Sequence, residues 1–302
     1  MTTSVPDAAT LRALPKVELH CHLEGSVRPA TIIDLARKNG VELAVDDPTE
    51  LYEFENLTQF LDVYSVICAS LRTADDFRRI TYESLQDGVA AGVRYREMFF
   101  SPGFIVGADV SLTDMWAGIR AGLVDAHADL DIRCRMILDV DKGAPPASAV
   151  ELVEFAAEQD RDELIGIGGD NSEHGIDHGV RLVEDPDLLR RVAEARIPLT
   201  VCPISNLLIA RMVSSVSEHP FEQLRDAGVL VTINSDDPGM TGTTIVDDFV
   251  QLAEAFDYDF VTVAGIALDA IDASWAPADE RRTLTERFQR EIAAIATTGA
   301  TP

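Results

Sequence analysis

Two histidines one residue apart, His20 and His22, lie in a β-like run over residues 17–22. Side chains at i and i+2 of a strand point to the same face, so both imidazoles can reach one metal ion. Much later, the segment 235–238 contains Asp236 and Asp237. Two histidines and a distant aspartate suit zinc and leave a position for water. The pattern predicts a hydrolase, although a lone His-x-His also fits two metal-free histidines at a strand end.

Four segments surround these residues. They read Leu-Pro-Lys-Val-Glu-Leu-His-Cys-His-Leu-Glu-Gly-Ser at 14–26, Ile-Asp-His-Gly at 176–179, Val-Cys-Pro-Ile-Ser-Asn at 201–206 and Thr-Ile-Asn-Ser-Asp-Asp-Pro at 232–238. In this order they resemble the adenosine/adenine deaminase family of zinc-dependent aminohydrolases. The resemblance covers most of the chain and implies an α/β fold, a (β/α)8 TIM-type barrel.

The resemblance also implies the metal site and the catalytic residue. His20, His22 and Asp236 match the family's ligands for one Zn2+ ion per chain. His178 matches the catalytic histidine that hydrogen-bonds the attacking hydroxide. A buried structural histidine is the alternative interpretation of His178.

Three further residues match substrate-binding positions of the family. Asp237 corresponds to the carboxylate that binds the purine N7 edge, and Gly169 to the glycine whose backbone amide contacts the ring. Glu24 corresponds to an acidic position near the sugar in the nucleoside enzymes. Asp237 could instead cap the helix that follows it.

The implied reaction is hydrolytic deamination to a 6-oxo purine and ammonia, but the branches of the family differ in substrate. Gly169 and Asp170 resemble the nucleoside-acting branch, whereas Glu24 and the stretches 60–73 and 99–100 resemble the branch that acts on free adenine. We predict adenosine or a related 6-aminopurine nucleoside. Adenine and 6-aminodeoxyfutalosine are the alternatives.

Composition limits the partners and the compartment. The 302 residues carry a formal net charge of −27, which argues against nucleic acid or an anionic membrane as a partner. A small-molecule purine is the expected partner, and the oligomeric state stays open. The four cysteines, none in a Cys-x-x-Cys pair, are expected to be buried free thiols. Without a run of signal-peptide or membrane-helix length, a cytoplasmic protein is expected.

Strand-like and helix-like runs alternate along the chain, as in a parallel α/β barrel. We expect one domain over residues 1–302, with a helical lid insertion at about 30–91 made of helices at 30–39, 57–71 and 75–91. Three helices are also expected at 245–256, 260–271 and 278–295. Strands are expected at 17–22, 93–100, 132–140, 164–169, 175–180, 198–203 and 229–236.

The connection between the fourth and the next of these strands is anomalous. A parallel crossover needs a dozen or more residues, but the apparent gap near 171–175 leaves almost none. In the family, a helix-strand-helix unit belongs here, and its His-Ala-Gly-Glu motif supplies the third histidine ligand and the proton-donating glutamate. This chain contains no His-Ala-Gly-Glu, so the fifth strand unit is absent from its sequence.

Three explanations compete: a segment of the natural protein that this sequence omits, a genuine deletion, or a different local topology. We favour the first, because losing a strand would open the barrel and expose its core. It predicts that Glu173 and His174 are not covalently adjacent and that the omitted segment holds a fourth zinc ligand. A genuine deletion predicts a non-catalytic pseudoenzyme. Glu173 and His174 are poor replacements for the missing pair, since a short loop does not aim two side chains at a metal.

Overall fold

A computed structural model describes residues 4–45, 47, 50–105, 110–141, 145–169 and 176–298. Its strands are β1 (Lys16–Glu18), β2 (Val93–Phe100), β3 (Arg133–Asp139), β4 (Leu164–Gly168), β5 (Ile176–Asp177), β6 (Leu199–Val201) and β7 (Val231–Ile233). They form two sheets with the orders β1-β2-β3-β4 and β5-β6-β7, and every pairing is parallel. The seven expected strand regions are confirmed, with shorter bounds at several of them.

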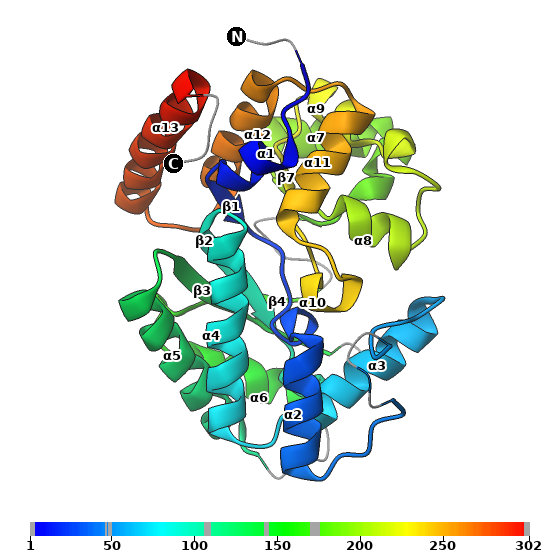
Figure 1. Cartoon of the computed structure of the whole chain (residues 1–302), viewed down its shortest axis with the longest axis vertical. Helices are drawn as coiled ribbons and strands as arrows, with labels where there is room; N and C mark the ends of the chain where they lie inside the picture. Colours follow the sequence, from blue (N-terminus) through cyan, green and yellow to red (C-terminus); the bar gives the residue numbers. More distant parts are fainter. Residues whose placement is uncertain are drawn as a thin grey trace.

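Helices follow the strands and cover the sheets (Figure 1). They are α1 (Ala8–Ala13), α2 (Pro29–Asn39), α3 (Leu57–Ser70), α4 (Ala74–Ala90), α5 (Leu112–Asp129), α6 (Pro146–Ala157), α7 (Pro186–Ala195), α8 (Pro203–Leu208), α9 (Phe221–Asp226), α10 (Pro238–Thr241), α11 (Ile245–Ala255), α12 (Phe260–Ala273) and α13 (Ala278–Thr298). Short 3-10 turns lie at Glu24–Ser26, Pro102–Phe104, Val180–Glu184 and Val216–Glu218. No helix within the described ranges combines the length and apolar character needed to cross a bilayer.

The two sheets meet just beyond β1. There the amide of Leu23 donates to the carbonyl of Phe99, which lies in β2, at 2.9 Å. On the other side, the amide of His22 donates to the carbonyl of Asp236, just after β7, at 2.8 Å. The segment that carries the histidines therefore joins β2 to the end of β7, and we call this junction the β1–β7 seam.

A side chain shortens the first strand. The strand expected at 17–22 ends at Glu18, because the amides of Leu19 and His20 both donate to the Asn234 Oδ1 atom, at 2.7 and 3.2 Å. Asn234 follows β7, so this bulge also fixes the register between the two sheets. It sets the direction in which His20 leaves the backbone.

The opposite junction, between β4 and β5, differs. Among the described residues, β4 pairs only with β3, and β5 pairs only with β6. The middle of β4 is partly exposed, whereas β2 is buried along nearly its whole length. We call this junction the β4–β5 seam. Residues 170–175, on which the predicted chain break falls, lie outside the described residues, and so closure into a barrel stays a prediction.

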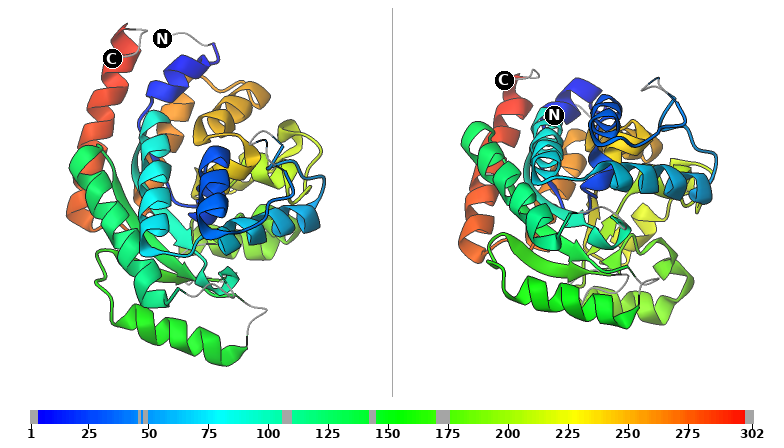
Figure 2. Two further views of the ribbon diagram at one scale, coloured as in Figure 1. Left: turned by 60° about the horizontal axis from the view of Figure 1, so that its bottom comes forward. Right: turned by 90° about the horizontal axis from the view of Figure 1, so that it is seen from below.

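The chain between β1 and β2 forms α2, α3 and α4, as expected for residues 30–91. Figure 2 shows α2 and α3 side by side. The helix α4 begins at a capping box, in which Thr73 binds the Asp76 amide and the Asp76 side chain binds the Thr73 amide. Asp75, where this helix was expected to begin, lies inside its first turn.

Candidate metal centre and purine pocket

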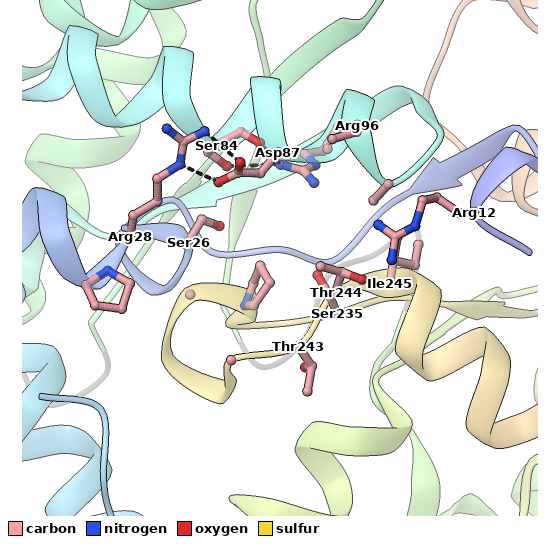
Figure 3. Close-up of a pocket in the computed structure, with 17 residues that line it drawn as sticks. Arg12, Ser26, Arg28, Ser84, Asp87, Arg96, Ser235, Thr243, Thr244 and Ile245 are labelled. Atoms are coloured by element: carbon pink, nitrogen blue, oxygen red, sulfur yellow. Dashed lines mark hydrogen bonds and ion pairs between the residues drawn. The ribbon is translucent and has the colours of Figure 1, made fainter. Parts of the chain in front are cut away.

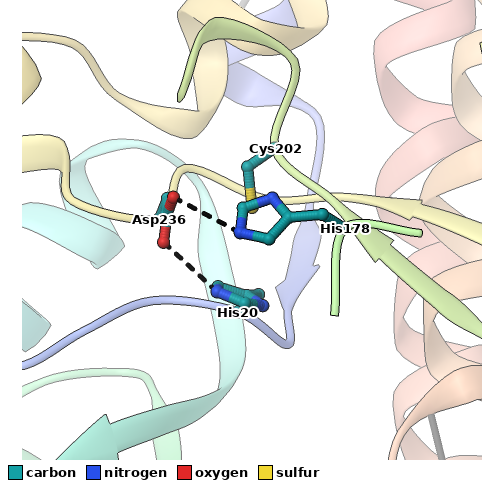
Figure 4. Close-up of side chains that lie close together, drawn as sticks. All are labelled: His20, His178, Cys202 and Asp236. Carbon is teal, nitrogen blue, oxygen red and sulfur yellow. Dashed lines mark ion pairs between the residues drawn. The ribbon is translucent and has the colours of Figure 1, made fainter. Parts of the chain in front are cut away.

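The residues predicted to bind metal converge at the β1–β7 seam. His20 and His22 reach the same carboxylate, because their Nε2 atoms lie 3.2 and 3.3 Å from Asp236 Oδ1. The His178 Nε2 atom lies 3.7 Å from the other oxygen, Asp236 Oδ2. Figure 4 shows the side chains of His20 and His178 turned toward Asp236 from different segments. Residues more than 200 positions apart in the sequence thus share one point in space.

Unusual backbone conformations aim two of these side chains. His178, directly after β5, has a φ of 58°, and Asp236, after β7, has a φ of 66°. Such left-handed conformations are costly for residues with a Cβ atom and concentrate at functional sites. Ser205 holds Asp236 in place, because its Oγ donates to Asp236 Oδ2 at 2.5 Å.

The electrostatics of the cluster favour a cation. Burial lowers the pKa of His20, but hydrogen bonds to Asp177 and Asp236 outweigh burial and raise the pKa to about 10. Burial also opposes protonation of His22, and yet Asp236 and Asp237 raise its pKa to about 9. Burial raises the pKa of Asp236, but the neighbouring histidines hold it well below its usual range. Asp236 therefore stays a carboxylate that needs positive charge beside it.

The geometry of these atoms fits a zinc ion. Zinc lies 2.0–2.2 Å from nitrogen and oxygen ligands, and so two ligands of a tetrahedral site lie about 3.3 Å apart. The distances from Asp236 Oδ1 to His20 Nε2 and His22 Nε2 match this spacing. The His20 Nε2 atom is also buried, and its 3.2 Å contact with Asp236 Oδ1 does not have the geometry of a hydrogen bond, as expected of two atoms that face one metal ion. Cys202 lies within the same cluster, but burial raises the pKa of its thiol well above the usual value.

A second layer of side chains orients the histidines, and the sequence analysis missed it. His20 Nδ1 lies 3.3 Å from Asp177 Oδ1 and 3.2 Å from Thr200 Oγ1. Ligand histidines commonly use their other nitrogen in this way, which fixes the tautomer and the ring orientation. Asp177 ends β5, whereas Thr200 lies in the middle of β6, so an acidic residue at a strand end was the available signal for Asp177 alone.

A further chain of contacts holds His178. Asn206 Nδ2 lies 3.0 Å from His178 Nδ1, and Asn206 Oδ1 lies 3.2 Å from His219 Nε2. Burial lowers the pKa of His178 to about 4. His219 has polar neighbours in the sequence, which suggest a surface position, but it is buried at 3% exposure because it packs behind Asn206. His127, in similarly polar surroundings, is exposed.

A cavity of about 150 Å3 lies beside the metal ligands. It is lined by His22, Phe60, Leu61, Tyr64, Ser101, Asp139 and Asp237. Phe60, Leu61 and Tyr64 belong to α3, so the helices between β1 and β2 cover this cavity. Asp139, which ends β3 and accepts from Ser101 Oγ at 3.2 Å, is a lining carboxylate that the sequence analysis did not single out.

Asp237 is a buried carboxylate with an unusual affinity for a proton. Burial and the neighbouring Asp236 raise the pKa of Asp237 to about 7, and its Oδ1 atom has no hydrogen-bond partner in the described part of the chain. A Cβ atom on Gly25 would lie 1.7 Å from that oxygen, so Gly25 leaves the space for it. Asp237 starts α10 but makes no side-chain cap hydrogen bond, which argues against the helix-cap alternative.

Glu24 and Gly169 do not line this cavity. Glu24 is fully buried, and its carboxylate accepts from Tyr64 OH at 3.2 Å and from the Ser101 amide at 3.0 Å. Gly169 directly follows β4, and a Cβ atom placed there would meet nothing within 4 Å. Its predicted ring contact stays a prediction. Asp170, Glu173 and His174 lie outside the described residues.

Comparisons with known proteins agree with this site. The structure is similar to an amidohydrolase from Burkholderia ambifaria with bound Zn (TM-score 0.86, 28% identity, covering 96% of this chain and 94% of that one). It is also similar to an adenine deaminase from Arthrobacter aurescens (TM-score 0.85, 28% identity, covering 94% and 99%). The fold and the site together define an aminohydrolase enzyme of the amidohydrolase type.

The family follows from the sequence matches. The model of the adenosine deaminase family matches residues 15–176 and 174–291. An adenine deaminase from Vibrio parahaemolyticus is 31% identical over 332 residues, covering 94% of this chain and 98% of its own length. This chain belongs to the adenosine deaminase family.

Proposed function

We propose that this enzyme deaminates a 6-aminopurine with one zinc ion per chain, and that free adenine is its preferred substrate. The observation that carries the proposal is that a metal ligand, His22, and a buried carboxylate suited to a purine edge, Asp237, line one small cavity. The relatives at about 30% identity that bear the name adenine deaminase support the same reaction.

The size of the cavity favours the base over the nucleoside. Pockets for drug-sized ligands start at about 300 Å3, and the described lining encloses about half of that, about 150 Å3. Glu24, the residue expected near a sugar, is turned into bonds with Tyr64 and Ser101. Adenosine, our first prediction from the sequence, therefore becomes the second candidate, and 6-aminodeoxyfutalosine the third.

The residues of the site have separate roles in metal binding, catalysis and substrate binding. His20, His22 and Asp236 hold the ion, which, when bound, lowers the pKa of a coordinated water and so supplies the nucleophile. His178 faces that position through Nε2, while Asn206 holds its Nδ1 side. Asp237 lines the cavity with a carboxyl oxygen that has no hydrogen-bond partner among the described residues, and this oxygen binds the ring nitrogen. Phe60 and Tyr64 exclude water from the ring faces.

The family's third histidine and its glutamate have no counterpart motif in this sequence. The matched stretches of the family model meet at residues 174–176, and the Vibrio alignment of 332 residues is longer than this chain of 302, as both an omitted segment and a genuine deletion would produce. If a segment is omitted, the natural protein carries both groups at the β4–β5 seam. If the deletion is genuine, the second candidate applies, namely a metal-dependent purine-binding protein without turnover.

One experiment distinguishes the deaminase from the purine-binding protein without turnover. The intact mass of the natural protein is measured beside its zinc content and its release of ammonia from adenine and from adenosine. A mass several kilodaltons above 32.9 kDa with ammonia release, faster from adenine, supports the deaminase. A mass of 32.9 kDa with bound zinc and purine but no ammonia supports the binding protein. Failure to bind zinc would overturn both.

A further inference from the structure

A second cavity, larger than the first, lies on the helix side of the β1–β7 seam. Its volume is about 310 Å3, within the range of ligand pockets. Figure 3 shows it between α4, the start of α2, the segment after β7 and Arg12 of α1. None of the predicted catalytic or metal-binding residues lines it.

The charge of this cavity is opposite to that of the protein. Arg12, Arg28 and Arg96 line it, although the chain as a whole carries a net charge of −27. The one carboxylate in its lining, Asp87, is already bound by Arg28, with Nε to Oδ2 at 2.8 Å and Nη2 to Oδ1 at 2.6 Å. Arg12 is exposed and makes no ion pair with a described residue. The cavity thus offers a cation that the protein itself does not neutralise.

Arg96 supplies a second, buried donor. Its side chain is only 3% exposed, and it binds Glu18 Oε2 through Nη2 at 2.5 Å and Ser84 through Nη1 at 3.0 Å. Its Nε–H group is buried and has no partner in the described structure. Arg96 therefore adds a buried positive charge to the wall of the cavity, and Glu18 neutralises it only in part, since one of its hydrogen-bond donors stays unused. Gly88 makes room for the guanidinium, because a Cβ atom there would lie 2.7 Å from Nη2.

The rest of the lining is consistent with an organic anion. Thr243, Thr244 and Ile245 bring the N-terminus of α11, whose helix dipole favours negative charge, although Asp247 offsets part of that field by capping Thr244. Pro29, Ala91 and Pro238 add apolar walls. A small organic molecule with one anionic group would therefore contact both the positively charged and the apolar parts of the lining.

We propose that this cavity is a binding site for a small molecule with a phosphate or carboxylate group, separate from the catalytic pocket. Its occupant would touch the segments that carry the metal ligands. Ser26 lines the cavity and donates to the His22 carbonyl at 2.6 Å, and Ser235 and Pro238 flank Asp236 and Asp237. A bound molecule would stabilise this backbone and so affect how firmly the metal ligands are held in position.

Calorimetric titration at constant ionic strength tests the proposal, with inorganic phosphate in one arm and succinate in the other. The expected result is saturable binding of at least one of them to the natural protein. Arg12→Gln should weaken it about fivefold to tenfold, as for the loss of one charge-assisted contact. Arg190→Gln, which removes an exposed arginine of α7 outside the cavity, is the matched control and should change nothing.

Phosphate could also bind at the metal, and so the titration is repeated after zinc is removed by chelation. Binding that survives chelation and weakens in Arg12→Gln supports the proposed site. Binding that disappears with the metal, binding that is equal in Arg12→Gln and the natural protein, or no saturable binding in either arm would overturn it. The arm with the tighter binding identifies the anionic group.

Discussion

The two seams between the sheets differ in how completely the described chain closes them. At the β1–β7 seam, backbone hydrogen bonds and the Asn234 side chain join the sheets, and all three proposed metal ligands lie there. At the β4–β5 seam, no described strand pairing crosses, and the middle of β4 is partly exposed. The three proposed ligands described here thus lie at one edge of the fold, whereas the family's third histidine and its glutamate would come from the other, so one set can be intact while the other is incomplete.

The largest effect is expected from breaking the metal site at the closed seam. His20→Ala or His22→Ala should remove zinc and activity together, because each imidazole is one of few protein ligands. Metal content by elemental analysis, beside ammonia release, checks this. Full zinc occupancy in the double variant His20→Ala/His22→Ala would contradict the ligand assignment.

The two neighbouring aspartates should respond differently. Asp237→Asn should keep zinc but lose roughly a hundredfold to a thousandfold in kcat, because it removes a charged group that contacts the substrate. Asp236→Asn should weaken zinc binding as well, since its oxygen lies beside both histidines. Equal zinc content in the two variants, measured after dialysis against a weak chelator, would mean that the roles are wrongly divided.

A smaller loss, of zinc affinity, is expected when the partner of the ligand His20 is changed. Asp177→Asn removes the carboxylate at His20 Nδ1, and we expect zinc affinity to fall about tenfold to a hundredfold, as for other partners of ligand histidines. Competition with a fluorescent chelator measures the affinity. Arg181→Gln, on the exposed turn that follows, is the control and should leave it unchanged. An unaltered affinity in Asp177→Asn would show that His20 is oriented without this contact.

The pH dependence of the stability should report on Glu97, a buried carboxyl group of β2. Glu97 is buried, and burial raises its pKa to about 7 despite hydrogen bonds from Tyr95 OH and the Trp275 amide. The folded state therefore holds a proton that the unfolded chain releases above its ordinary pKa of 4.5. The free energy of unfolding should fall as the pH rises from about 4.5 to about 7, by on the order of 3 kcal/mol.

Denaturation midpoints across this pH window measure the effect. Glu97→Gln, which cannot ionise, should reduce the fall without removing it, because Asp237 also has a pKa raised to about 7, and it should leave the zinc content unchanged. A slope in Glu97→Gln as steep as in the natural protein would assign the pH dependence to other groups.

The sequence predicted the strand regions well, and the structure brings together the three residues predicted to bind metal, because strand-like runs and the His-x-His spacing are visible within a few residues. Their role as zinc ligands stays a prediction. The burial of His219 leaves no such pattern, since its polar neighbours give no sign that the chain folds it against Asn206, 13 residues earlier. Asp177 and Thr200 were missed for the same reason: their role is defined only when β5 and β6 lie next to His20.

Trp275 is a natural fluorescent reporter of the β4–β5 seam. Its ring lies against Gly166 of β4, where a Cβ atom would come within 2.3 Å of the indole, and its amide binds Glu97 of β2. The chain contains two tryptophans, and the other, Trp116, is buried in α5. A Trp116→Phe protein would therefore emit from a single indole beside the β4–β5 seam. Its emission maximum and its quenching by acrylamide would report whether that edge is dry and closed or open to solvent.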